Sequence, residues 1–105
     1  MYALLITFYA TNPLDELEAP FTEYARALRS MPGLLSKAWI RDGDSLGGFH
    51  LFADRASAEA YLASDLATGL RATDGFDDFE IRGFEVLGEL SALTGIRDLA
   101  PLAAS

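Results

Sequence analysis

The segment from Tyr2 to Tyr9 constrains the fold most strongly, because each of its residues is either apolar or favours β-structure. A run of this kind is typical of a strand that is covered on both faces of its sheet. A chain of 105 residues forms one domain, so the covering layers come from its own helices and, where these reach only one face, from a second molecule. The run is too short for a signal-peptide core or a membrane span, and we expect a cytoplasmic protein.

A helix is predicted after the break at Asn12-Pro13. Apolar residues recur at spacings of three and four from Leu14 to Met31, which makes one apolar stripe. Pro20 lies inside this stripe and has no backbone donor, so we expect the regular helix to begin near Pro20, with residues 14–18 as a preceding turn. Pro32-Gly33 ends it.

The remaining elements follow from alternation and turn chemistry. Two strands, Leu34 to Arg41 and Gly47 to Phe52, form a hairpin across the turn at residues 42–45. Asp54 is a good N-cap for the second helix, and Phe79 to Leu87 is predicted as the last strand. We expect one domain over residues 1–94 and a C-terminal tail over residues 95–105, either mobile or lying on a neighbouring molecule.

The order β-α-β-β-α-β predicts a ferredoxin-like α+β fold with a four-stranded antiparallel sheet. Right-handed crossovers place both helices on one face and leave the other bare. Covering two bare faces buries about 800 Å², worth on the order of 20 kcal/mol against an association cost of roughly 4 to 15 kcal/mol. We therefore predict a homodimer through the sheet face, a dimeric α/β barrel. The alternative is a monomer whose free face is covered by the short tail.

Composition excludes several classes of function. The formal net charge is −8, which argues against nucleic acid and anionic membranes as partners. The chain has no cysteine, so it forms neither a disulfide nor a thiolate metal site. His50 is the only histidine, and no phosphate-binding or dinucleotide-binding motif is present. We expect neither a metal nor a cofactor.

One grouping of residues stands out as a candidate site. Three residues of the second strand alternate and therefore share one face of the sheet: Lys37, Trp39 and Arg41. If the hairpin closes through residues 43–46, Trp39 lies opposite His50 and Lys37 lies opposite Phe52. A slip of one residue would move His50 to the other face.

These residues form a hypothetical catalytic set for an aromatic substrate. His50 would act as the general base, since the pKa of a histidine ordinarily lies near neutral pH. Trp39 would stack on the substrate and donate its ring N–H, while Lys37 or Arg41 would stabilise a phenolate or enolate oxygen. The alternative is a structural role for each residue. His50 would form its hydrogen bonds within the sheet, and Trp39 would pack in a core or an interface. The side chains of Lys37 and Arg41 would lie at the edge of the sheet with their charges in water.

Further aromatic residues are candidates for contact with the substrate. Tyr9, Tyr24 and Tyr61 are expected to line a pocket between sheet and helices, Tyr9 because a strand end in a barrel is a common ligand position. We take Tyr9, Tyr61 and Phe52, together with Arg41, as candidate substrate-binding residues. The alternative for each aromatic residue is core packing.

Several short motifs carry a resemblance to a known family. They are Pro32-Gly33-Leu34-Leu35, Lys37-x-Trp39, Gly47-Gly48-x-x-Leu51-Phe52, Asp54, and Ser57-Ala58-x-x-Tyr61-Leu62. Over Tyr2 to Thr94 the chain resembles the YdhR-type monooxygenases of the dimeric α/β-barrel superfamily, which also holds antibiotic-biosynthesis monooxygenases. It departs from that type at His50, where a tyrosine is expected in the third strand.

The resemblance implies oxygenation of an anthrone-type or quinol-type aromatic without flavin, haem or metal. Once deprotonated, such a substrate reduces oxygen itself, and the protein supplies a base, an anion-stabilising donor and a dry pocket. The fold also hosts other chemistries. Two alternatives therefore stay open: a cofactor-free cyclase or isomerase of a polyketide-like substrate, and a non-catalytic barrel that binds a small ligand.

Overall fold

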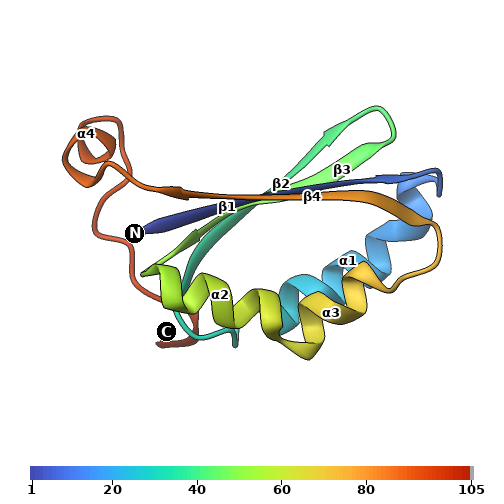
Figure 1. Cartoon of the computed structure of the whole chain (residues 1–105), viewed down its shortest axis with the longest axis horizontal. Helices are drawn as coiled ribbons and strands as arrows, with labels where there is room; N and C mark the ends of the chain where they lie inside the picture. Colours follow the sequence, from blue (N-terminus) through green and yellow to red (C-terminus); the bar gives the residue numbers. More distant parts are fainter. Residues whose placement is uncertain (105) are drawn as a thin grey trace.

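The computed structural model describes residues 1–104 and consists of a four-stranded antiparallel sheet with three helices packed on one side and a short fourth helix beyond the end of the last strand (Figure 1). The strand order is β2-β3-β1-β4, which confirms the predicted ferredoxin-like α+β fold. The elements are β1 (Tyr2–Ala10), α1 (Leu14–Leu28), β2 (Leu34–Asp42), β3 (Ser45–Phe52), α2 (Arg55–Ala63), α3 (Asp65–Arg71), β4 (Phe76–Glu85), α4 (Gly88–Leu93) and the 3-10 turn η1 (Leu102–Ala104).

Helix α1 begins earlier than the sequence predicts. It starts at Leu14 and continues through Pro20, so the expected start near Pro20 was wrong. The backbone bond that Pro20 cannot donate would have gone to the carbonyl of Glu16. Both residues are exposed, so water can satisfy that carbonyl, while Leu17 and Leu28 keep the helix anchored in the core.

The β2–β3 hairpin differs in register from the expectation. Lys37 lies opposite His50 and Trp39 lies opposite Gly48, so the predicted Trp39–His50 pairing was wrong by two residues. The cause is a tighter turn, in which only residues 43 and 44 separate the strands and Gly43 has a φ of +59°. A shift of two residues preserves the face of every side chain.

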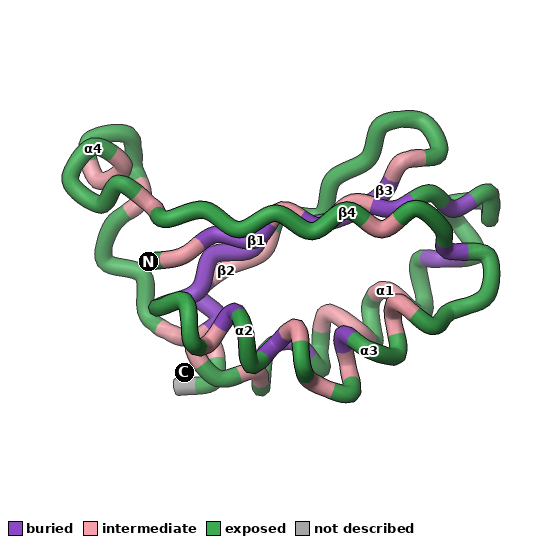
Figure 2. The backbone as a smooth tube through the Cα atoms, viewed as in Figure 1, coloured by how far each residue is buried: buried purple, intermediate pink, exposed green. Residues whose placement is uncertain are grey.

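The core lies between the sheet and the helices. Strand β1 sends Leu4, Ile6 and Phe8 toward α1, α2 and α3, and all three are buried. Buried positions concentrate on the two central strands, β1 and β3, and on the helix turns that face the sheet (Figure 2). At the start of α2, Asp54 accepts a hydrogen bond from the backbone N–H of Ser57, which confirms the predicted N-cap.

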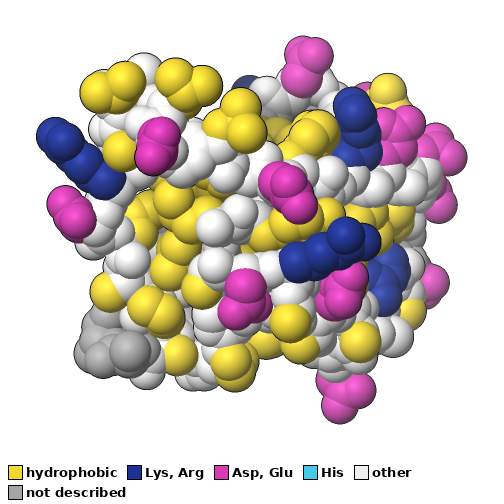
Figure 3. Space-filling view, turned by 60° about the vertical axis from the view of Figure 1, so that its left-hand side comes forward, with side chains coloured by type: hydrophobic (Ala, Val, Ile, Leu, Met, Phe, Trp, Pro, Cys, Tyr) yellow, Lys and Arg dark blue, Asp and Glu magenta, His cyan; other side chains and the backbone are white. Residues whose placement is uncertain are grey.

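The other side of the sheet, called here the outer face, carries apolar side chains with little cover. Phe49 and Phe84 are both more than one third exposed. A groove of about 730 Å³ runs from this face to α4, where Leu90 and Leu93 are exposed. Figure 3 shows hydrophobic side chains gathered over this part of the surface.

The C-terminal segment returns toward the sheet. Ile96 packs against the outer-face cluster of Ala3, Leu35 and Leu51, and Leu102 packs against the main core. The predicted tail ends at Ser105, which lies outside the described residues. Within residues 1–104, no helix combines the length and apolar character that crossing a membrane requires.

Candidate active site

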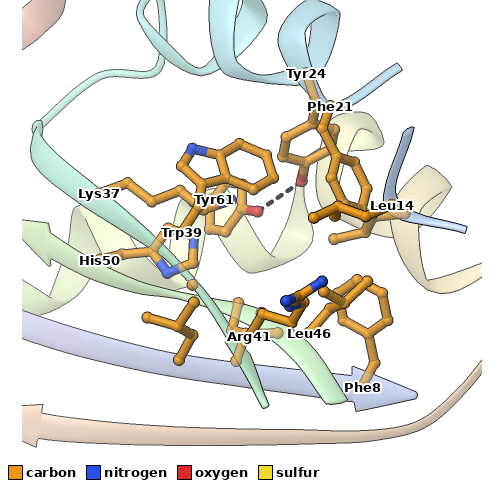
Figure 4. Close-up of a pocket in the computed structure, with 15 residues that line it drawn as sticks. Phe8, Leu14, Phe21, Tyr24, Lys37, Trp39, Arg41, Leu46, His50 and Tyr61 are labelled. Atoms are coloured by element: carbon orange, nitrogen blue, oxygen red, sulfur yellow. Dashed lines mark hydrogen bonds between the residues drawn. The ribbon is translucent and has the colours of Figure 1, made fainter. Parts of the chain in front are cut away.

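A pocket of about 310 Å³ opens between the helix side of the sheet and helices α1 and α2 (Figure 4). This volume lies at the lower end of the range for small-molecule sites, about 300–1,000 Å³. Its polar lining consists of Tyr24, Lys37, Trp39, Arg41, His50 and Tyr61. The helix side of the sheet therefore forms the pocket, and the outer face remains free for other contacts.

Strand pairing explains why the four sheet residues meet. Lys37, Trp39 and Arg41 alternate along β2, and their partners on β3 are His50, Gly48 and Leu46. Directly paired residues point to the same side of a sheet. The shared face that the sequence predicts for these side chains is present, although the register differs.

Two of the expected substrate-binding residues lie elsewhere. Tyr9 is on the outer face and 54% exposed, because it alternates with the buried Phe8 and Ala10; it does not line this pocket. Phe52 is fully buried in the core, where its ring lies 5.7 Å from the ring of Tyr61 and 6.2 Å from that of His50. Phe52 therefore supports the wall of the pocket from behind.

The amine of Lys37 lies against aromatic rings. Its Nζ is 3.5 Å from the centre of the Trp39 ring and 5.2 Å from that of Tyr24, which is cation–π geometry. In the described part of the chain no carboxylate forms an ion pair with it; the ion pair there joins Arg55 and Glu59. Burial lowers the pKa of Lys37 from its usual 10.5 to about 7.

His50 is buried and presents one free ring nitrogen. It is 1% exposed, and its Nδ1 lies 3.2 Å from the carbonyl oxygen of Leu4. A carbonyl only accepts hydrogen bonds, so Nδ1 carries the ring hydrogen and Nε2 of the neutral ring keeps its lone pair. Nε2 is buried and has no hydrogen-bond partner among residues 1–104.

The acid–base character of His50 differs from the expectation. Burial, followed by the nearby charge of Lys37, lowers the pKa of His50 to about 4. The expected pKa near neutrality was therefore wrong. At neutral pH the ring is uncharged and acts as a hydrogen-bond acceptor, whereas Lys37 is the group of the pair that titrates there.

A pair of tyrosine hydroxyls closes the helix side of the pocket. Tyr24 on α1 and Tyr61 on α2 lie with their hydroxyl oxygens 2.6 Å apart (Figure 4). Burial raises the pKa of both phenols, so both are protonated at neutral pH. One hydroxyl hydrogen is used within the pair, which leaves the other for a ligand.

Sequence reasoning missed two residues that shape the site. Phe21 on α1 lies 5.2 Å, ring centre to ring centre, from Trp39. The sequence placed it only within the apolar stripe from Leu14 to Met31, and that stripe was the available signal. In the sequence, Gly48 stood out only as part of a motif shared with the family that the chain resembles. A Cβ at Gly48 would collide with Cε of Lys37 and lie 2.9 Å from Cε1 of His50, so the glycine makes room for both side chains.

The charge of the pocket contrasts with that of the whole chain. Lys37 and Arg41 are its charged residues, and within residues 1–104 no aspartate or glutamate lines it, although the net charge of the chain is −8. This contrast favours an electron-rich or anionic ligand. The described residues contain no group of three or more His, Cys, Asp or Glu arranged to hold a metal ion.

Several solved structures share the fold. SnoaB, a cofactor-independent oxygenase from Streptomyces nogalater, matches with a TM-score of 0.64 and 21% identity over 81% of this chain and 91% of that chain. NE2512, a protein of unknown function from Nitrosomonas europaea, matches with a TM-score of 0.62 and 23% identity over 83% and 89%. An antibiotic biosynthesis monooxygenase from Deinococcus radiodurans, described as putative, matches with a TM-score of 0.65 and 17% identity over 82% and 92%.

Sequence comparison assigns the family. No curated protein sequence matches the chain significantly. The family model described as "Putative mono-oxygenase ydhR" matches residues 3–96, which span β1 to the end of α4 and include every residue of the pocket. The resemblance seen in the sequence motifs is confirmed, and the chain belongs to this family.

Proposed function

We propose that the chain is a cofactor-independent monooxygenase that oxidises a hydroxylated aromatic compound of the anthrone or quinol type. The observation that carries this proposal is the amine of Lys37, which lies in an aromatic pocket beside His50 and, within residues 1–104, has no carboxylate paired to it. Membership of the mono-oxygenase family supports it. So does the shared fold of SnoaB, which is described as a cofactor-independent oxygenase.

The first step is deprotonation of the substrate, and the two candidate bases differ in strength. A phenol has a pKa of about 10. Transfer to His50, with a pKa of about 4, is uphill by about 8 kcal/mol, whereas transfer to Lys37, with a pKa of about 7, is uphill by about 4 kcal/mol. Lys37 is thus the better base, and the ammonium that results stabilises the oxyanion. Where the substrate carries a further ring hydroxyl, His50 Nε2 accepts a hydrogen bond from it and orients the ring.

The second step is attack on dioxygen by the deprotonated substrate. In an anthrone the reacting carbon carries two hydrogens; it forms a bond to one oxygen atom, and the O–O bond then breaks. One oxygen stays on the carbon as a carbonyl, and the other leaves as water with the two hydrogens. The substrate supplies all four electrons, so the stoichiometry requires no external reductant. Trp39 and Phe21 hold the aromatic ring and limit the access of water.

We also infer that the outer face packs against a second copy of the chain. Phe49, Phe84 and the groove beside α4 support this inference, because contiguous apolar surface of this extent is rare on monomers. The pocket lies on the opposite side of the sheet, so dimerisation leaves its mouth open. The second copy would complete the barrel that the sequence predicts.

Oxygen uptake with anthrone as the substrate tests the proposal. The purified chain is expected to accelerate uptake above the protein-free rate, and Lys37→Met and Trp39→Ala are expected to abolish the acceleration. Arg26→Met, which removes an exposed cation from α1, is the matched control and should keep full activity. Full activity of Lys37→Met would refute the assignment. Turnover under nitrogen would favour the cyclase or isomerase, and tight binding without turnover would favour a binding barrel.

A further inference from the structure

We propose that the amine of Lys37 also bonds covalently to aromatic aldehydes or ketones, so that the pocket is an imine-forming site. This inference requires the pocket and its amine but does not depend on oxygen chemistry. It assigns to the site a second class of ligand, carbonyl compounds, in addition to hydroxylated aromatics.

The chain places its only side-chain amine in this pocket. Lys37 is the single lysine of the sequence, and the other basic residues are arginines apart from His50. A guanidinium stays protonated and does not act as a nucleophile at neutral pH. Any imine formed by a side chain of this protein therefore forms at Lys37.

The surroundings of the amine keep it reactive. Its Nζ rests over the rings of Trp39 and Tyr24, and within residues 1–104 it has no ion-pair partner that would hold it as an ammonium. Burial lowers its pKa to about 7. At pH 7 about half of such amines are neutral, on the order of a thousandfold more than for an ordinary lysine.

The polar groups of the pocket suit the steps of imine formation. Nζ bonds to the carbonyl carbon, and the carbonyl oxygen takes up a proton to become a hydroxyl. The Tyr24–Tyr61 pair has one uncommitted hydroxyl hydrogen to donate to that oxygen, and His50 Nε2 offers a lone pair to relay a proton. As the C=N bond forms, the C–O bond breaks and the oxygen leaves as water with both hydrogens of the amine. No oxidant or reductant takes part.

Reductive trapping tests this proposal. The full chain is treated with 2-naphthaldehyde and sodium cyanoborohydride near pH 7, and adducts are located by mass spectrometry of peptides. We expect one naphthylmethyl group on Lys37. The labelling rate of Lys37 is expected to saturate as the aldehyde concentration rises, and to fall when 2-naphthylmethanol competes for the pocket. The α-amino group of the chain, outside the pocket, is the internal reference. Lys37→Arg is expected to remove this adduct and leave the α-amino adduct unchanged.

A comparison of folded and urea-unfolded wild-type chains keeps the test decisive even if the variant does not fold. Folding is expected to raise the labelling rate of Lys37 on the order of tens of fold, because the gain in neutral amine exceeds the loss of nucleophilicity that accompanies a lower pKa. Equal rates in the two states, or no saturation, would overturn the proposal. Trapping without anthrone-dependent oxygen uptake would refute only the oxygenase function; uptake without trapping would refute only the imine site.

Discussion

Two adjacent glycines on β3 allow a matched test of how the pocket is built. Gly48 faces the pocket, and a Cβ there would collide with the flexible end of Lys37 and lie 2.9 Å from Cε1 of the buried His50 ring. Gly47 faces the other way, and a Cβ there would collide with the backbone carbonyl oxygen of Ile6. A side chain can swing aside, whereas a backbone in the middle of a sheet cannot.

The two alanine substitutions are therefore expected to differ in kind. Gly48→Ala displaces the amine from the Trp39 ring, which costs about 0.5–2 kcal/mol of cation–π energy. A small shift of the His50 ring adds about 1 kcal/mol to this cost, and removing a glycine from a strand returns about 0.5–1 kcal/mol, so this variant is expected to lose no more than about 2 kcal/mol of stability. Gly47→Ala forces the backbone apart and is expected to cost about 1–3 kcal/mol. Urea unfolding measures both changes.

The pKa of Lys37 provides the second readout. Because Lys37 is the only lysine, a chain carrying ¹³C-labelled lysine gives a single Cε resonance, and its shift against pH gives the pKa directly. We expect a midpoint near 7 for wild type. Gly48→Ala is expected to raise the midpoint by roughly two units toward the value of a solvated lysine, and Gly47→Ala, if folded, should not move it. A wild-type midpoint near 10, or no shift in Gly48→Ala, would refute the account of the amine.

Further predictions concern stability and assembly. The pKa of His50 is about 4 in the folded chain, against the usual 6.5. Between these pH values the unfolded chain therefore binds more protons than the folded chain. The difference in pKa contributes about 3 kcal/mol to the free energy of unfolding at neutral pH, and this contribution is lost as the pH falls from about 6.5 to 4. In urea titrations across this pH range, the free energy of unfolding of His50→Gln should fall less steeply with decreasing pH than that of wild type. An equal dependence on pH in the two proteins would contradict the burial of a neutral ring. Phe49→Glu places a charge on the outer face and is expected to convert a dimer into a folded monomer in sedimentation analysis; a monomeric wild type would count against the paired sheets. Pro20→Ala restores a backbone donor inside α1 and is expected to stabilise the chain by up to about 3 kcal/mol, measured as the midpoint of thermal unfolding, whereas a lower midpoint would show that the proline suits its place.

Alternation along the strands made much of the site predictable. The pattern of β2 and the predicted hairpin placed Lys37, Trp39, Arg41 and His50 on one face, and all four line the pocket. The pairing register of β2 and β3 could not be predicted from alternation, because a two-residue shift leaves every side chain on its original face. The length of the turn at Gly43 decided the register, and the sequence pattern does not fix that length.

Other features depend on three-dimensional packing that no local pattern encodes. Strand β1 is apolar on both faces, so the sequence alone did not show which face forms the pocket, and Tyr9 was placed on the wrong one. The low pKa of His50 arises from residues that surround it in space. The continuation of α1 through Pro20 depends on core contacts made by Leu17 and Leu28.

Incorporation of isotopic oxygen tests the central proposal most directly. The purified chain is incubated with anthrone under ¹⁸O₂, and the product is analysed by mass spectrometry with a protein-free control and Lys37→Met alongside. The account predicts anthraquinone carrying one heavy oxygen atom, formed faster than in both controls, with the second atom released as water. Product without the label, or formation no faster than in Lys37→Met, would contradict a cofactor-independent oxygenase that uses Lys37 as its base.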